Sequence, residues 1–321
     1  MKVTVFGESM SPGVGVILEG LPAGEEISES DIKDELQREY PGFSEIGATA
    51  VEDTPVITSG VYAGVTTGAP LCVLIRTPSQ STPQNNPEIP RPGLPDFAAR
   101  IRFGGYNDPR EGGAFGTRLV TPLIAAGAIC RSILLRRSVS VSSKIVGIGA
   151  ARGTELDNAM RKEILDARAS GDSIGGIVEC RAVGLRPGLG GLVFDGIEGC
   201  IARALFALPS VRGVEFGAGF EIAAMRGSEA NDPIRIEDGQ IFTETNNAGG
   251  ALQGLTTGMP MIVRCAVAPT PAISREQKTI DLEKRENVTI RLRGRNSPCL
   301  VPLTAVAAEA ALCLTLLEAM L

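Results

Sequence analysis

Residues 64–78, GVTTGAPLCVLIRTP, and residues 254–271, GLTTGMPMIVRCAVAPTP, are two versions of one sequence. A second pair precedes them in the same order, with GVGVILEGLPAG at 13–24 and IGGIVECRAVGLRPGLG at 174–190. Repeats that recur in the same order indicate a duplicated structural unit. Each unit is typical of a strand, a Gly/Pro turn, a helix, a strand, a Gly/Thr turn and a final strand. The pattern predicts two βαβ-like halves related by a pseudo-two-fold axis, with their boundary near Ser170.

We therefore expect a single domain over residues 1–321, with pseudo-repeats at about 1–170 and 171–321. The fold class is α+β, or layered α/β, because sheet-forming and helix-forming segments are interspersed with Gly-rich turns. Helices are predicted at 28–39, 119–136, 154–169 and 194–208, and from Ser297-Pro298 onward, where a hydroxyl N-cap precedes proline. Strands are predicted at 3–6, 139–148, 174–183, 214–225, 261–267 and 288–292.

Composition narrows the classes of protein to which the chain can belong. A chain of 321 residues with a 43% hydrophobic share can build a full core. Aromatic content of 4%, no tryptophan and a net charge of -6 disfavour nucleic acid as a partner, because such partners need stacking platforms and cations. The apolar stretch from Pro298 is interrupted by Glu309 and Glu318, which favours a buried or interface helix over a membrane span.

The seven cysteines are scattered and never spaced as CxxC. This pattern favours buried thiols in a reducing compartment over a disulfide framework or a metal site. The first residues also lack the charged region and apolar run of a signal peptide. We expect a cytoplasmic protein without a bound metal.

The chain contains no histidine. Histidine is the only side chain whose unperturbed pKa lies near neutrality, so any proton transfer here must use another side chain, water or a cofactor. Neither a Walker A sequence nor a strand-linked G-x-G-x-x-G is present, so an ATPase or Rossmann protein has no support.

An ordered set of motifs along nearly the whole chain resembles the chorismate synthase family. The matching pieces are FGES (6–9), GLPAG (20–24), LQREYPG (36–42), SGVYAGVTTGAP (59–70), RPGLPD (91–96), DSIGGIVEC (172–180), LPSVRGVEFGAGF (208–220), RGSEANDP (226–233), TNNAGG (245–250), GMPMIVRCAVAPTP (258–271) and GRNSPC (294–299). The resemblance implies a β-α-β sandwich, usually a homotetramer. It also implies binding of reduced FMN and elimination of phosphate from 5-enolpyruvylshikimate 3-phosphate to give chorismate.

The sequence departs from the family pattern at positions that carry protons. The family motif GESHG has histidine where this chain has Met10, and RPGHAD has histidine where it has Leu94. The family's GRHDPC has a carboxylate where this chain has Ser297, next to Asn296. None of these replacements titrates near neutrality, so the catalytic residues are unknown from the sequence.

The anion-binding positions have also changed. Arginines of the family's RRRPG and SR motifs correspond to Glu39 and Glu45, whereas Arg118 and Arg295 remain as substrate-binding candidates. At an effective dielectric constant of 20, a unit charge about 4 Å away contributes roughly 4 kcal/mol, so such a reversal opposes a trianionic substrate.

The cofactor positions are partly kept. The candidates implied by the family motifs are Asn246, Asn247, Pro269, Thr270 and Arg295. Against them, Ala268 stands where the family's KPTS turn has lysine, and Ala114, Phe115 and Gly116 replace the Arg-Ser-Ser of GGRSSAR. FMN binding is therefore expected to be weak or absent.

Three hypotheses follow from these departures. The first is a divergent enzyme of the family that acts on a different, less anionic ligand. The second is an inactive pseudoenzyme or a partner subunit of an intact chorismate synthase. The third is chorismate synthase activity by an altered mechanism. The sequence favours the first, because the reversed charges disfavour the family substrate.

Overall fold

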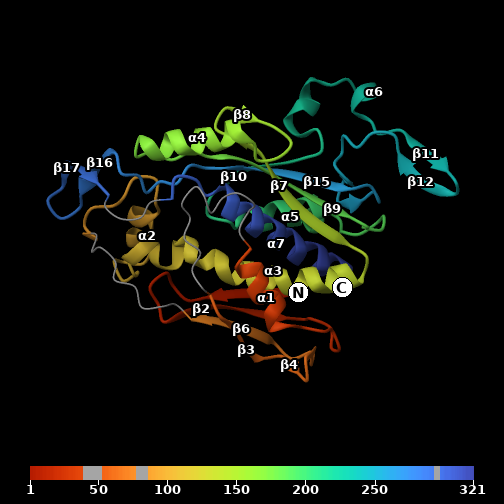
Figure 1. The fold of residues 1–321 in the computed structure, drawn as a ribbon, viewed down its shortest axis with the longest axis horizontal. Helices are drawn as coiled ribbons and strands as arrows, with labels where there is room; N and C mark the ends of the chain where they lie inside the picture. Colours follow the sequence, from red (N-terminus) through yellow and green to blue (C-terminus); the bar gives the residue numbers. More distant parts are fainter. Residues whose placement is uncertain (39–52, 77–85, 293–296) are drawn as a thin grey trace.

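Two antiparallel β-sheets face each other across a layer of helices (Figure 1). The computed structural model describes residues 1–38, 53–76, 86–292 and 297–321. The first sheet has the strand order β1-β2-β6-β3, and the second has the order β10-β15-β9-β7-β8. Their bounds are β1 Lys2–Phe6, β2 Gly13–Glu19, β3 Pro55–Ser59, β6 Leu71–Arg76, β7 Ser140–Ile148, β8 Ala151–Arg152, β9 Gly176–Val183, β10 Val211–Phe216 and β15 Met261–Val267.

Both copies of the sequence repeat form the same structure. In the first sheet β2 and β3 flank β6, and in the second β9 and β10 flank β15. Because all these pairs are antiparallel, each outer pair of strands is mutually parallel and forms a split βαβ unit. The helices of these units are α1 (Glu29–Leu36) and α5 (Ile197–Phe206). The predicted βαβ-like duplication is therefore present in the fold.

The boundary between the halves is not at Ser170. The order β1, β2, α1, β3, β6, α3 matches the order β7, β9, α5, β10, β15, α7, so the second half begins at β7, near residue 138. Between β7 and β9 the second half carries an insertion of β8 and α4. The recognisable repeats began only at β2 and β9, so the insertion shifted the expected boundary.

Two long helices occupy the layer between the sheets (Figure 1). They are α3 (Val120–Arg136) and α7 (Val301–Met320). The stretch Arg110–Arg136, which contains α3, and α7 itself are long and apolar enough for a membrane span, yet both are largely buried in this fold. The helices approach closely at Gly127, where a Cβ would lie 2.2 Å from the Cβ of Ala310. The predicted buried helix at 119–136 is confirmed. The amphipathic helix α4 (Asn158–Ala169) covers the outer face of the second sheet.

Several predicted boundaries are wrong for local reasons. The last helix begins at Val301 and not at Ser297, because the Ser297 hydroxyl donates to the Cys299 carbonyl (2.9 Å) and does not cap the helix. The predicted strand 214–225 ends at Phe216, since Gly217 adopts a φ of 55° and a 3₁₀ turn follows. Helix α1 ends at Leu36, within the predicted 28–39, although Ser28 caps it as expected.

Shorter elements complete the described chain. The Gly/Thr turns of the repeat are the hairpins β4–β5 and β13–β14, and the hairpin β11–β12 projects from the body (Figure 1). The remaining bounds are β4 Val61–Tyr62, β5 Val65–Thr66, α2 Asp96–Arg102, α6 Gly227–Ala230, β11 Ile234–Glu237, β12 Gln240–Thr243, β13 Ala251–Leu252, β14 Leu255–Thr256, β16 Glu276–Asp281 and β17 Glu286–Arg291.

Candidate functional site

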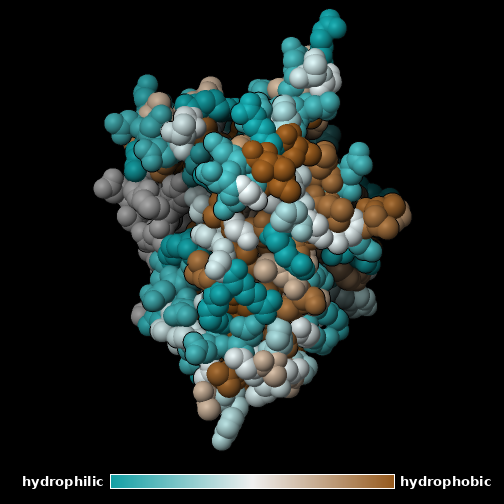
Figure 2. Space-filling view, turned by 90° about the vertical axis from the view of Figure 1, so that its right-hand side faces the viewer, coloured by the Kyte–Doolittle hydropathy of each residue, from teal (hydrophilic) through white to brown (hydrophobic). Residues whose placement is uncertain are grey.

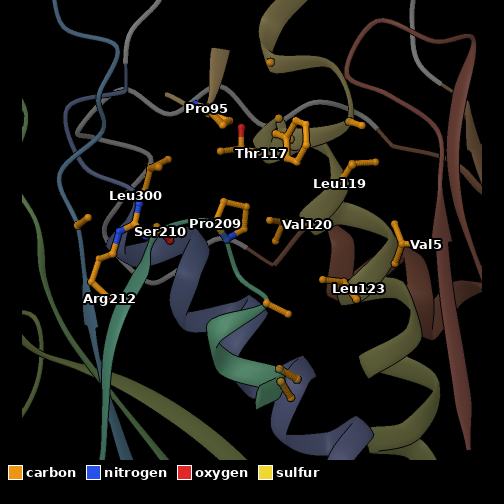
Figure 3. Close-up of a pocket in the computed structure, with 18 of the residues that line it drawn as sticks. Val5, Pro95, Thr117, Leu119, Val120, Leu123, Pro209, Ser210, Arg212 and Leu300 are labelled. Atoms are coloured by element: carbon orange, nitrogen blue, oxygen red, sulfur yellow. The ribbon is translucent and has the colours of Figure 1, made fainter. Parts of the chain in front are cut away.

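A cavity of about 1260 Å³ lies where the edge strand of each sheet meets the helical layer. Figure 3 shows Ser210, Arg212 and Leu300 on one side of it and Val5 and Leu123 on the other. Its wall is built from the start of β1, the segment 91–95, the loop 111–117, α3, α5, the start of β10, the segment 268–272, Ser297 and α7.

Small side chains on two helices make room for the cavity. Along α5 and its C-cap residue, Cys200, Ala204 and Ala207 recur at intervals of three or four residues and therefore share one face. On α7, Ala311 and Thr315 do the same. The space thus follows from small residues at helical spacing. It is large enough for a cofactor together with a substrate, since typical ligand sites occupy about 300–1,000 Å³.

The loop at one end of the cavity is locked to the turn that follows β1. The Ser9 amide and hydroxyl both donate to the Gly113 carbonyl, at 3.1 and 3.2 Å. A Cβ on Gly116 would lie 1.8 Å from the Ser9 Oγ, so this contact requires glycine. Gly116, where the resemblance implies a serine in the family, thus has a packing reason in this chain.

The three positions that the resemblance assigned to proton transfer do not lie together in the wall. Leu94 and Ser297 line the cavity, whereas Met10 is half-buried in the turn after β1 and is not part of the wall. The Ser297 hydroxyl is engaged with the Cys299 carbonyl. These side chains therefore give the cavity no titrating group.

Two arginines near the site are neutralised by aspartates. Arg118 donates to both oxygens of Asp53, each at 2.7 Å, and does not line the cavity. Arg91 lines the cavity but binds both oxygens of Asp96, at 2.7 and 2.9 Å. Hydrogen bonding to Asp96 raises the pKa of Arg91 above its usual value. Arg118, which was expected to contact the substrate, is thus already paired with an aspartate of the protein.

The cofactor candidates separate into two groups. Pro269 and Thr270 line the cavity, and the buried Thr270 Oγ1 has no hydrogen-bond partner among the described residues. Asn246 instead closes its own turn, donating to the Pro260 carbonyl and accepting from the Gly250 amide, both at 2.8 Å. Asn247 donates to the Glu229 carbonyl at 3.0 Å, and it lines a second cavity of about 830 Å³. Glu39, Glu45 and Arg295 lie outside the described residues.

Three unpaired charged groups of the wall were not identified from the sequence. They are Arg203 on α5, Arg212 on β10 and Glu111, and within the described ranges none forms an ion pair or a side-chain hydrogen bond. Arg203 follows Cys200 by three residues on the helix face described above. This helical spacing could have predicted that Arg203 lines the cavity. Arg212 and Glu111 carry no comparable signal, because only the fold brings them to the same cavity.

The seven cysteines all lie in the described part of the chain and form no disulfide there. All seven thiols are free, and five are buried. Burial raises the pKa of the Cys265 thiol to about 12 and that of Cys299 to about 11. Within the described residues no group of three or more Cys, Asp or Glu side chains is arranged to hold a metal ion.

The fold is thus a β-α-β sandwich whose large, partly charged cavity between its sheet edges has the volume of a small-molecule site. The chain belongs to the chorismate synthase family, because the family model described as Chorismate synthase matches residues 1–321. It is 43% identical over 342 residues to the chorismate synthase of Korarchaeum cryptofilum, covering 99% of this chain and 95% of that one. It is 44% identical over 322 residues to that of Thermococcus kodakarensis, covering 94% and 90%. A crystal structure of chorismate synthase superposes with a TM-score of 0.76 at 28% identity, covering 99% of this chain and 91% of that chain.

Proposed function

We propose that this protein catalyses the reaction of its family, elimination of phosphate from 5-enolpyruvylshikimate 3-phosphate to chorismate, with proton-transfer groups other than histidine. The observation that carries the proposal is the cavity. It gathers Leu94, the 268–270 segment and Ser297, which come from motifs far apart in the sequence. Relatives that match over nearly the full length are named chorismate synthase. This is the third hypothesis of the sequence analysis.

The other two hypotheses have less support. The case for a less anionic ligand rests on Glu39 and Glu45, which lie outside the described residues. In the described wall, the unpaired cations Arg203 and Arg212 outnumber the unpaired carboxylate Glu111, and this balance suits an anionic substrate. The hypothesis of an inactive pseudoenzyme has no support from the relatives, which are named chorismate synthase.

Reduced FMN fits the site in part, and we propose that the chain binds it weakly. The buried hydroxyl of Thr270, which has no hydrogen-bond partner in the described part of the chain, is a ready ligand donor, and Pro269 beside it lines the same space. Ala114 and Ala268, however, supply no charge to a phosphate. When bound, the reduced flavin supplies the electron density that helps to expel phosphate. The protein's own groups bind the anions and orient the substrate.

The test is an anaerobic assay with purified protein, reduced FMN and 5-enolpyruvylshikimate 3-phosphate, following chorismate formation and its dependence on FMN concentration. We expect chorismate to form. The FMN concentration at half-maximal rate should be about tenfold or more higher than for a relative that has lysine and arginine at the positions of Ala268 and Ala114, because a lost charged hydrogen bond weakens binding by about 1.5–3 kcal/mol. Absence of product at saturating FMN, where a relative turns over, would refute the proposed function.

We also propose, from the family resemblance, that the protein is a cytoplasmic homotetramer. Exposed apolar side chains on the β11–β12 hairpin support self-association. On the face seen in Figure 2, hydrophobic side chains gather in clusters among hydrophilic ones.

A further inference from the structure

We propose that the loop tip at residues 192–194 inserts into an apolar groove of a second copy of this chain, and that the second copy makes the same contact in return. The proposal rests on the proposed homotetramer, because it names the surfaces through which two subunits meet. The tip is Leu192-Val193-Phe194, in the loop that leads from β9 to α5. The groove is the second cavity, of about 830 Å³, whose wall includes residues of the β11–β12 hairpin.

The tip exposes three consecutive apolar side chains. Leu192, Val193 and Phe194 are 80%, 85% and 93% exposed. Single exposed apolar residues are normal on a protein surface, whereas a contiguous group of them marks an interaction site. The tip therefore has the character of a surface that a partner covers.

The backbone holds the tip in a strained turn. Val193 has a φ of 52°, and among the described residues it is the only β-branched one with a positive φ. A β-branched side chain is strongly disfavoured in this left-handed region. The turn is closed by the Asp195 amide, which donates to the Leu192 carbonyl at 3.1 Å. Because the Val193 side chain gains little burial within its own chain, a contact outside the chain must offset this strain.

The groove presents apolar side chains to its occupant. Five of those that line it are between 45% and 81% exposed, and they come from the segment after β10 and from two hairpins: Phe220, Ile222, Ile234, Ile241 and Leu252. Two of them lie on the β11–β12 hairpin and one on the β13–β14 hairpin. An apolar tip of leucine, valine and phenylalanine matches such a wall.

The carboxylates of the groove are already engaged. Glu198 accepts from the Gly254 amide at 3.3 Å, and Glu215 accepts from Arg264 at 2.7 Å. Asp232 accepts hydrogen bonds from two backbone amides. No lysine or arginine stands among the described residues of the groove wall. The groove thus offers apolar contact and no free charge, which suits the tip better than a charged ligand.

The tip and the groove adjoin each other on one surface. The β13–β14 hairpin connects them, because the Gly191 amide donates to the Gly254 carbonyl at 3.3 Å and Gly190 forms a β-bridge with Leu255, while Leu252 lines the groove. A two-fold contact uses the same surface on both subunits, so each contact is made twice. One chain therefore carries both halves of the contact, which identifies the occupant as a second copy.

The area of this surface also fits a subunit interface. At roughly 100–200 Å² for each large apolar side chain, the eight side chains of tip and groove expose on the order of 1,000 Å². A monomer usually exposes apolar patches of about 300–600 Å², whereas a stable interface needs about 800 Å² from each partner. Figure 2 looks at the molecule from the side on which the β11–β12 hairpin projects in Figure 1, and hydrophobic side chains gather there.

Photo-cross-linking tests the contact directly. A photoreactive benzoylphenylalanine replaces Phe194, and isotope-labelled and unlabelled copies of the full chain are irradiated after they have exchanged subunits. We expect mass spectrometry to find cross-links between a labelled and an unlabelled chain that join residue 194 to peptides within 214–222, 230–243 or 247–257. The same group at Tyr106, which is 96% exposed and outside the groove wall, should give no cross-links to these peptides.

Two substitutions at the tip separate association from folding. Phe194→Ser should raise the dissociation constant of the assembly at least about tenfold, because a buried aromatic anchor is removed. Val193→Gly should also raise it, yet leave the Tm of the dissociated chain unchanged or higher, since glycine relieves the strain. A variant that merely unfolds cannot produce this pair of changes. Tyr106→Ser is the control and should alter neither quantity.

The possible failures are distinguishable. Cross-links from residue 194 to other regions only, or none between chains of an oligomeric protein, would refute the tip-and-groove contact and leave the homotetramer standing. An unmodified protein that is monomeric by light scattering would refute both. Chorismate formation is measured separately, so failure of the proposed reaction does not affect this result.

Discussion

At the scale of single residues, ion pairing decides which charges of the site can meet a ligand. Arg118 resembles a substrate-binding residue in sequence, yet Asp53, 65 positions earlier, holds both ends of its guanidinium. Arg203 and Arg212 belong to no motif that was recognised in the sequence. In the structure both line the cavity, and neither has an ion-pair partner within the described ranges. Pairings between distant segments cannot be read from local pattern, so the motifs identified the region of the site but not its available charges.

The TNNAGG turn offers a prediction at the same scale. Asp232 accepts hydrogen bonds from the Thr245 hydroxyl (2.6 Å) and from the amides of Asn247 (2.7 Å) and Ala248 (2.9 Å). Burial alone would raise the pKa of Asp232, but these hydrogen bonds lower it below the usual 3.8. We expect Asp232→Ala to reduce the free energy of unfolding at pH 7 by about 1–2 kcal/mol, a value discounted because the carboxylate is partly exposed.

The pH dependence gives this prediction its sign. Because the folded-state pKa is the lower one, the stabilisation is complete above the unfolded value near 3.8 and is lost as the pH falls through the folded value. Urea unfolding of protein and variant should therefore converge toward pH 3. Glu237→Ala, at an exposed strand position, is the control and should show no such convergence. A difference that persists unchanged to pH 3 would contradict the prediction.

At the scale of elements, the sequence predicted what local signals encode. The repeat gave the two split βαβ units, the apolar helix at 119–136 is α3, and the Ser28 cap starts α1. The errors arose where tertiary contacts override local signals. Ser297 resembles an N-cap but bonds to Cys299, and the insertion holding α4 concealed the true start of the second half. Helix and strand types were therefore predictable, but ends and boundary were not.

Helix α7 carries a buried charge that ties the elements together. Glu309, 3% exposed, accepts from Arg38 at 2.9 and 3.0 Å and from the Ser143 hydroxyl at 3.0 Å, and Arg131 lies 3.4 Å away. Removing one partner of a buried pair leaves the others uncompensated. We expect Glu309→Ala to reduce the free energy of unfolding by about 3 kcal/mol.

Glu318 provides the comparison for Glu309 on the same helix. Its side chain is 44% exposed and, among the described residues, binds the amino terminus of Met1 alone, so Glu318→Ala should cost under about 1 kcal/mol. Chemical denaturation monitored by circular dichroism measures both changes. Equal effects of the two substitutions would show that the network around Glu309 contributes no more than a surface pair.

At the scale of the whole molecule, the duplication explains the position of the site. Each half contributes one sheet and one long helix, and the cavity lies where β1 of the first half and β10 of the second leave the edges of their sheets open. Its wall consequently mixes residues from both halves, such as Leu94 with Thr270 and Val5 with Arg212. The duplication was visible in the sequence. The cavity was not, because it depends on how the two halves pack.

The assembly provides the last prediction. Ile234 and Ile236 lie two residues apart on β11 and therefore point to the same face. Ile236 pairs with Ile241 on β12, so the three side chains share one face of the projecting hairpin. They are 75%, 74% and 74% exposed, and an apolar face of this kind marks an interaction surface.

We expect light scattering to give about four times the 33.5 kDa chain mass for the unmodified protein. The double substitution Ile236→Lys and Ile241→Lys should give a smaller assembly with unchanged circular dichroism. Leu165→Lys, on the outer helix α4, should leave the mass unchanged. A monomeric unmodified protein would refute the tetramer, and a tetramer that survives the double substitution would show that the hairpin face is not part of its interface.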